Sequence, residues 1–127
     1  MLAKLISKYN KAANILDKQK ALKIIKKKNP KTVLETGCFS GEFLSDIKKQ
    51  CNSTAVGIEL DPLGIKKAKE KGLKIISCDL NSTIPLNTKF DCIVSMQVIE
   101  HLYFTDKYLE ECKRLLNDDG IIVITTT

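Results

Sequence analysis

Residues 33–43 read VLETGCFSGEF, the most informative segment of the sequence. Apolar strand residues lead to Glu35, Gly37 and Gly41 follow in a turn, and a helical pattern begins at Glu42. A strand that passes through a glycine-containing turn into a helix is how a βαβ unit begins. Ligands in open α/β sheets bind beyond the carboxyl ends of such strands. The stretch therefore predicts both a parallel sheet and the place of its ligand site.

The rest of the chain continues the alternation of strand and helix. Short, apolar, β-branched segments predict strands, and amphipathic segments between them predict helices. We expect strands at 32–36, 54–59, 74–77, 90–95 and 121–126, helices at 42–50, 62–71 and 106–116, and a turn at 117–120. This pattern indicates an α/β fold: a doubly wound, mainly parallel sheet of about five strands with helices on both faces.

Two N-terminal helices are expected ahead of the sheet, over residues 2–15 and 18–28. The apolar stripe of the first changes phase after Asp17, which is a suitable N-cap for the second, and Asn29-Pro30 ends the second helix. The first stripe consists of Leu2, Leu5, Ile6, Tyr9, Ala13 and Leu16, and the second of Ala21, Leu22, Ile24 and Ile25.

The length of 127 residues fits a single domain, with helices over 1–30 and a cofactor-binding α/β core over 31–127. The net charge of +6 is uneven, because residues 1–31 hold ten lysines and one acid. A basic segment can bind nucleic acid, but the basic residues are nearly all lysine and no aromatic cluster accompanies them. We therefore favour a solvated helix face over a nucleic-acid surface, and no apolar run is long enough to span a membrane.

The five cysteines are far apart, and no pair has the spacing of a zinc knuckle or a redox pair. This indicates small buried thiols in a reducing compartment and no metal site. The N-terminus has lysines among its apolar residues and so lacks the pattern of a cleavable signal. We expect a cytoplasmic protein.

The first turn does not match either of two common phosphate-binding motifs. A dinucleotide site needs G-x-G-x-x-G, and counted from Gly37 the second and third glycine positions hold Phe39 and Glu42. A carboxylate at Glu42 would also repel a pyrophosphate. A Walker loop needs Gly-Lys-Ser/Thr after its spacer, and the turn has none. An NAD-binding domain is therefore disfavoured.

The turn instead resembles the acidic-x-G-x-G-x-G turn of class I S-adenosylmethionine-dependent methyltransferases. Glu35, Gly37 and Gly41 match this pattern, and Phe39 departs from it. S-adenosylmethionine has no phosphate, and its ammonium and sulfonium tolerate nearby acids. The stretches VGIELD, IISCDL, FDCIVSMQVIEHL and YLEECKRLLNDDGIIVITTT also resemble this family, so the resemblance covers about residues 20–127.

The resemblance implies roles for individual residues. Glu35 and the backbone of Gly37, Cys38, Phe39 and Gly41 would hold the methionine portion of the cofactor. Glu59 would take both ribose hydroxyls, Asp79 and Leu80 would contact adenine, and Ile58, Leu60 or Pro62 would cover its ring. The backbone at Ser95–Met96 would close the site, and Glu100 and His101 are candidate catalytic residues, His101 as a general base.

Phe39 is expected either to turn at negative φ or to be strained, and either to line the cofactor channel or to point into the helix layer. The acceptor is expected to be a small molecule. The family's sheet has seven strands and this sequence shows five, so the fifth would be an edge. The alternative function is a non-catalytic cofactor-binding or regulatory subunit, or a fragment, whose sheet is completed by a partner chain or a second copy.

Overall fold

A computed structural model of the chain describes residues 2–126, with the backbone alone for residues 3–14. Five strands form one sheet in the order β3-β2-β1-β4-β5, and every neighbouring pair is parallel. The strands are β1 (Thr32–Thr36), β2 (Thr54–Glu59), β3 (Lys74–Ser77), β4 (Phe90–Met96) and β5 (Leu116–Thr125). The predicted doubly wound α/β fold is therefore confirmed.

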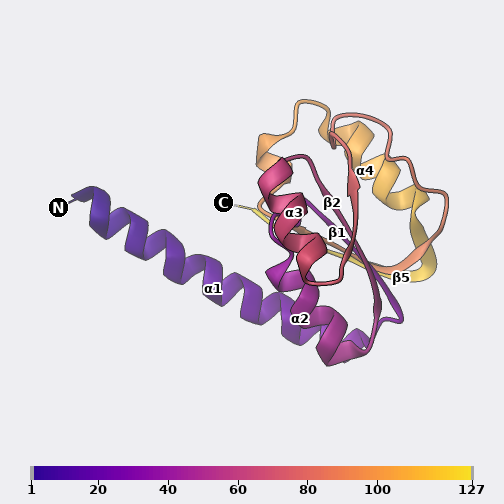
Figure 1. Ribbon diagram of the computed structural model, residues 1–127, viewed down its shortest axis with the longest axis horizontal. Coiled ribbons are helices and arrows are strands. Elements are labelled where there is room, and N and C mark those ends of the chain that lie inside the picture. The colour runs from indigo at the N-terminus through magenta and orange to yellow at the C-terminus, as the bar shows by residue number, and fades with distance from the viewer. Residues whose placement is uncertain (1, 127) are drawn as a thin grey trace.

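Helices cover both faces of this sheet (Figure 1). On one face lie α1 (Leu2–Lys28), α2 (Glu42–Cys51) and α3 (Pro62–Glu70), and on the other lies α4 (Thr105–Arg114). A short 3₁₀ helix, η1 (Ile99–His101), precedes α4 and was not predicted. In the described part of the chain, no helix has the length and apolar character that crossing a membrane requires.

Successive side chains of a strand point to opposite faces of the sheet, so each strand contributes to two separate hydrophobic cores. Val33 and Val94 pack with α1 and α2, whereas their neighbours Leu34 and Ile93 pack with α4. Because both faces are covered, the central strands are apolar at consecutive positions and do not alternate between apolar and polar. This explains why short apolar runs in the sequence identify the strands.

The prediction of two N-terminal helices is wrong, because α1 is continuous from Leu2 to Lys28. This segment contains no glycine or proline, and a single aspartate inside a helix costs only a few tenths of a kcal/mol. Ala21 and Ile25 are buried against the domain, whereas Leu16 is exposed. The change of apolar phase therefore marks where the helix begins to pack. The side chains of Leu5, Ile6, Tyr9 and Ala13 lie outside the described residues.

The N-terminal part of α1 projects away from the sheet (Figure 1). The helix ends as expected at Asn29, whose φ is +52° and whose N–H donates to the Ile25 carbonyl at 2.8 Å. Pro30 follows and cannot continue the helical hydrogen bonds.

The last strand begins earlier than predicted. Phe90 pairs with Leu116 and Cys92 pairs with Ile121, so the pairing register shifts between these positions. Residues 117–120, predicted as a turn before the strand, therefore bulge out within β5. Tight pairing resumes only after Gly120, where a Cβ would lie 2.7 Å from Leu116 Cδ1.

Gly41 allows the first turn to approach α3 closely. Its φ is +78°, and a Cβ there would lie 2.4 Å from Leu73 Cδ1 and 3.1 Å from Ala68 Cβ. Gly72 has nearly the same φ, +79°, but a Cβ there would meet nothing within 4 Å. The two glycines therefore share a backbone conformation and differ in the space around them.

We predict that Gly72→Ala costs about 1 kcal/mol of unfolding free energy, because only the backbone is strained. Gly41→Ala should cost about 2 kcal/mol more, because overpacking adds to the same strain. Urea unfolding of both variants and the unsubstituted chain measures the difference. Equal losses in the two variants would contradict the close contact.

Candidate functional site

The strand order reverses between β1 and β4, because the chain builds β1, β2 and β3 outward and then returns to the other side of β1. At the carboxyl ends of these two strands, Glu35 pairs with Val94 and Thr36 pairs with Ser95. In parallel pairing, partners point to the same face of the sheet. Glu35 thus faces α1 and α2, whereas Thr36 and Ser95 face α4.

Glu35 is a buried acid with an incomplete set of partners. Only 3% of the residue is exposed, and its Oε1 has no hydrogen-bond partner among the described residues. Burial raises the pKa of Glu35 to about 8, while the charge of Lys18 and a hydrogen bond from the Leu44 backbone act in the opposite direction. A buried acceptor without a donor is costly, so a donor from a ligand would stabilise it.

Ser95 presents a second unsatisfied atom at the same edge. Its Oγ is fully buried and has no hydrogen-bond partner in the described chain. The neighbouring Thr36 is paired, since its Oγ1 lies 2.7 Å from the Tyr108 hydroxyl of α4. Two unpaired polar atoms thus lie on adjacent strands at the point where the order reverses.

The turn between β1 and α2 bends through three left-handed residues. Gly37, Phe39 and Gly41 have φ of +67°, +46° and +78°. The Cys38 N–H donates to the Ile58 carbonyl of β2 at 3.0 Å, and the Gly41 N–H donates to the Cys38 carbonyl at 2.8 Å. Phe39 does not turn at negative φ, and holding a non-glycine residue in this region costs about 1–2 kcal/mol.

Glu59, at the end of β2, fixes this strained turn. Its Oε1 accepts the Phe39 N–H at 2.6 Å, and its Oε2 accepts the N–H groups of Leu60 and Asp61 at 3.1 and 3.0 Å. The Phe39 ring packs against Gly64 of α3, where a Cβ would lie 3.0 Å from Phe39 Cδ2. Phe39 was expected either to line the cofactor channel or to point into the helix layer. Its ring points toward the helix layer, although 48% of the residue remains exposed.

Cys38 has a packing role in the same turn. It is buried, and its Sγ would lie 2.6 Å from a Cβ at Gly57, so the glycine in β2 makes room for the thiol. Burial, together with the nearby Glu35 charge, raises the pKa of Cys38 to about 12. A thiol that stays protonated at neutral pH is a poor nucleophile.

The loop after β3 carries the next two predicted residues. Asp79 is exposed and its Oδ1 accepts the Asn81 N–H at 2.9 Å, which makes a local turn, while Leu80 is buried. The loop is anchored by Arg114, which donates to the carbonyls of Ile84 and Leu86 at 2.9 and 2.7 Å. Glu111 completes the anchor by accepting the Ile84 N–H and pairing with Arg114.

Asn81 joins two loops and was missed by the sequence analysis. Its Oδ1 accepts the N–H groups of Tyr103 and Phe104 at 2.8 and 3.2 Å. These donors lie immediately before α4, whose N-cap residue Phe104 supplies no capping side chain. An asparagine in a polar loop is a weak signal, since its partners lie more than twenty residues away.

The segment that follows β4 packs against the turn between β1 and α2. Gln97 has φ of +54°, and Val98 Cγ2 would lie 2.7 Å from a Cβ at Gly37, so only a glycine allows this approach. Glu100 and His101 follow in η1 and are exposed. Glu100 Oε2 accepts the Thr126 hydroxyl at 3.1 Å, so the end of β5 helps to hold this segment.

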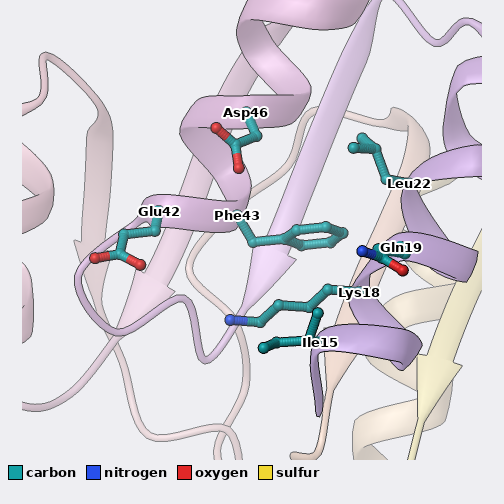
Figure 2. A pocket seen from close by; sticks show the side chains of 7 residues that line it. All are labelled: Ile15, Lys18, Gln19, Leu22, Glu42, Phe43 and Asp46. Carbon is teal, nitrogen blue, oxygen red and sulfur yellow. The ribbon is translucent and has the colours of Figure 1, made fainter. Parts of the chain in front are cut away.

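A hollow between α1 and α2 lies on the Glu35 side of the sheet. Lys18 of α1 and Phe43 of α2 are among the residues that line it, and Figure 2 shows the Lys18 chain extending below the Phe43 ring. Lys18 could not be singled out from the sequence, because nothing distinguishes it from the other lysines of this segment until the helix packs.

The structure therefore brings together most of the predicted residues. Glu35, the turn from Gly37 to Gly41, Glu59, Leu60 and Ser95 lie at the carboxyl ends of β1, β2 and β4, joined by the contacts above. Asp79 and Leu80 follow β3, and Glu100 and His101 follow β4, so every predicted residue lies at the same edge of the sheet. Their roles toward a ligand stay predictions.

Comparison with known proteins identifies relatives of this chain. Residues 7–127 match a protein family described as "Methyltransferase domain". The ubiquinone biosynthesis O-methyltransferase of Haemophilus ducreyi is 34% identical over 107 residues, which cover 76% of this chain and 45% of that protein. The chain thus spans about half the length of the curated relatives it matches.

Solved structures share the fold at lower identity. The sugar N-methyltransferase KedS8 from Streptoalloteichus sp. superposes with a TM-score of 0.79 and 17% identity, covering all of this chain and 54% of that one. The plantazolicin methyltransferase BpumL, solved in complex with SAH, gives a TM-score of 0.77 and 21% identity, covering 94% of this chain and 51% of that one.

We predict that Glu35 makes stability fall as pH rises. Between pH 4.5 and about 8 the unfolded chain loses the Glu35 proton while the folded chain keeps it. The free energy of unfolding should therefore decline across this window, by on the order of 5 kcal/mol in full, and Glu35→Gln should remove that decline. Urea unfolding at several pH values measures both profiles. If the stability of the unsubstituted chain and that of Glu35→Gln changed with pH in parallel, the pKa of Glu35 would not be raised by folding.

Proposed function

This chain belongs to the methyltransferase-domain family, the class I S-adenosylmethionine-dependent methyltransferases, and on that basis we propose that it binds S-adenosylmethionine and transfers its methyl group to a small-molecule acceptor. The observation that carries the proposal is the pair of buried, unpartnered atoms, Glu35 Oε1 and Ser95 Oγ, at the ends of adjacent strands. Folded proteins leave few such groups unpaired, and those that remain are often completed by a ligand.

The chemistry of these groups fits the cofactor. Glu35 is an acceptor in a dry site and suits the ammonium of the methionine portion. The backbone of Gly37, Cys38, Phe39 and Gly41 surrounds the same position. A pyrophosphate would meet the carboxyl groups of Glu42 and Glu59 there, so an NAD site is not supported.

Glu59 is proposed to bind the ribose, but the backbone N–H groups that it already accepts limit how many ribose hydroxyls it can take. A carboxylate offers about four acceptor sites, and three of them already receive backbone N–H groups. The site that remains is on Oε1, next to the Phe39 turn. The present geometry therefore supports one ribose hydroxyl on Glu59, whereas accepting both would require a backbone donor to leave.

Asp79 and Leu80 are proposed to contact adenine, with Leu60 covering its ring. Asp79 is exposed and lies after β3, next to the end of β2, and Leu60 is 58% exposed just beyond Glu59. An exposed leucine at a strand end offers an apolar surface to a base. Asn81 and Arg114 would hold the loop in place during binding.

When bound, the cofactor would supply a methyl group whose carbon an acceptor attacks in line with the carbon–sulfur bond, and that bond breaks to leave the neutral thioether S-adenosylhomocysteine. The protein's main task is then to hold the acceptor about 3 Å from that carbon. Glu100 and His101 are proposed to face the acceptor from η1, with His101 removing a proton where the acceptor carries one. Val98, packed over Gly37, would separate this side from the turn that holds the methionine end.

The proposal of a small-molecule acceptor rests on the relatives, which include an O-methyltransferase of ubiquinone biosynthesis and a sugar N-methyltransferase. We also propose that residues 1–127 act as one domain, since α1 packs on the core that begins at residue 31. The five cysteines are unpaired and four are buried, which favours a reducing compartment such as the cytoplasm.

We expect calorimetric titration with S-adenosylhomocysteine to give micromolar binding and no heat with NAD. Glu59→Gln should weaken binding tenfold or more, because a charged acceptor is lost from the ribose. The matched control Glu110→Gln removes an exposed acid of α4 and should leave affinity unchanged. No binding to a chain that is folded by circular dichroism would overturn the proposal.

A second candidate function, a subunit that needs another chain, rests on β5. This ten-residue strand lies at the edge of the sheet, and Ile124 is 37% exposed. An apolar edge strand with free N–H and C=O groups is prone to pair with another strand. We infer that this edge pairs with a further strand, supplied by a partner chain, by a second copy or by further residues of the same protein.

Light scattering after size-exclusion chromatography tests whether β5 pairs with a second copy of this chain. We expect the chain to associate at micromolar concentration, and Ile124→Lys should give monomers, because a charge on an edge strand opposes pairing. Leu63→Lys, at an exposed site on α3, is the matched control and should leave the mass unchanged. Monomers of the unsubstituted chain that bind and turn over cofactor would argue against any need for a partner.

A further inference from the structure

The described side chains of α1 divide between a face that packs on the domain and a face that does not. Ala21 and Ile25 are buried in the core, and Ile15 and Leu22 line the hollow toward α2 (Figure 2). Leu16, in contrast, is 54% exposed. Residues nine positions apart lie on opposite sides of a helix, because each residue advances the turn by about 100°. Leu16 thus lies opposite Ile25, on what we call the outer face of α1.

The apolar positions in the first half of α1 all fall on this outer face. With the same helical repeat, the six apolar positions that led to the prediction of a separate first helix lie within about 100° of one another and of Leu16. They are Leu2, Leu5, Ile6, Tyr9, Ala13 and Leu16 itself. Two separate helices would be free to turn this stripe toward the sheet. Because α1 is continuous, the stripe stays on the side away from the domain.

An apolar stripe in this place calls for an occupant from outside the domain. The N-terminal half of α1 extends beyond the sheet (Figure 1), and Leu2, at the start of the stripe, is 70% exposed. Helices in proteins gain most of their stability by packing an apolar face against something else. A stripe at this spacing is typical of a helix that buries it. The domain itself packs on the opposite face, so it leaves the stripe to another surface.

The charge of α1 indicates that this occupant is anionic. The helix contains nine lysines and one acid, Asp17. Beyond Leu16 the outer face continues with Lys20, Lys23 and Lys27, which lie four, seven and eleven positions further on and are all exposed. The outer face therefore has an apolar half followed by a basic half. A second copy of the helix would bring like charges together, which opposes a dimer through this face.

We propose that the outer face of α1 binds the surface of an anionic membrane. The apolar half would enter the boundary between head groups and acyl chains, and the lysines would contact the lipid phosphates. Interfacial helices combine these two features and lie in the plane of the membrane without crossing it. The domain leaves room for this arrangement, because Ala21 and Ile25 attach it to the opposite face of the helix.

A membrane surface accounts for both halves of the outer face. A nucleic acid would also attract the lysines, but its phosphate backbone offers no apolar surface to the stripe that ends at Leu16. The basic segment was expected to form a solvated helix face, and on a membrane the same lysines would lie among hydrated head groups. The inference is independent of the proposed methyl transfer.

Vesicle flotation with the full chain tests this proposal. Vesicles of phosphatidylcholine mixed with phosphatidylglycerol provide an anionic surface, and vesicles of phosphatidylcholine alone provide a neutral one. Leu16→Ser probes the apolar half, and its matched control is Leu63→Ser, because Leu63 of α3 is 55% exposed and Leu16 is 54% exposed. Circular dichroism of each variant shows that it is folded.

The basic half is probed by removing three lysines together. The variant replaces Lys20, Lys23 and Lys27 by glutamine. The matched control replaces three exposed lysines of α3 by glutamine and so has the same net charge; they are Lys66, Lys67 and Lys69. The comparison separates a local lysine surface from the overall charge of the chain.

We expect the unsubstituted chain to bind anionic vesicles about tenfold or more tightly than neutral ones. Leu16→Ser should weaken that binding about threefold to tenfold, and loss of the three α1 lysines about tenfold to a hundredfold. Both controls should stay within about twofold of the unsubstituted chain, since neither alters the outer face.

Three results would overturn the proposal. The folded chain binds neither kind of vesicle, or it binds both equally, or the α3 controls lose as much affinity as the α1 variants. Light scattering adds a decisive alternative. A chain that ignores vesicles but forms dimers that Leu16→Ser abolishes would show that the outer face belongs to a second copy.

Discussion

Every other feature of this molecule depends on the need to bury a parallel sheet on both faces. The central strands β1 and β4 are apolar toward α1 and α2 on one side and toward α4 on the other. Water is therefore excluded from the ends of these strands as well as from their middles. Polar groups that lie there, such as Glu35 and Ser95, therefore have few partners, and this is the basis of the ligand role proposed for them. The reversal of strand order between β1 and β4 then leaves space for one.

The first turn shows how a rule of the family can be broken locally. Phe39 occupies a left-handed position that usually takes glycine, and its strain is offset by two contacts. Its N–H donates to Glu59 and its ring packs on Gly64, a small residue that leaves room for it. The same hydrogen bond occupies part of the Glu59 carboxylate. That donor is a backbone group, so it limits the proposed contact of Glu59 with a ribose whichever side chain residue 39 carries.

The N-terminal helix has two tasks along its length. Its last turns pack on the core through Ala21 and Ile25, while its beginning projects from the domain (Figure 1). Lys18 lies where these two parts meet, next to the hollow that α1 forms with α2. Among the described lysines of this basic segment, Lys18 is the one that lines the hollow.

The fold class, the five strands and the place of the candidate site could be predicted from the sequence, because local rules govern them. The apolar runs, the turn from Gly37 to Gly41 and the acids at the strand ends are all read within a few residues. The rest is visible only in the folded chain. There α1 is continuous, Phe39 is held by Glu59, Asn81 binds the backbone just before α4, and Val98 packs over Gly37. These features depend on contacts between residues distant in the chain, and such contacts leave no periodic pattern in the sequence.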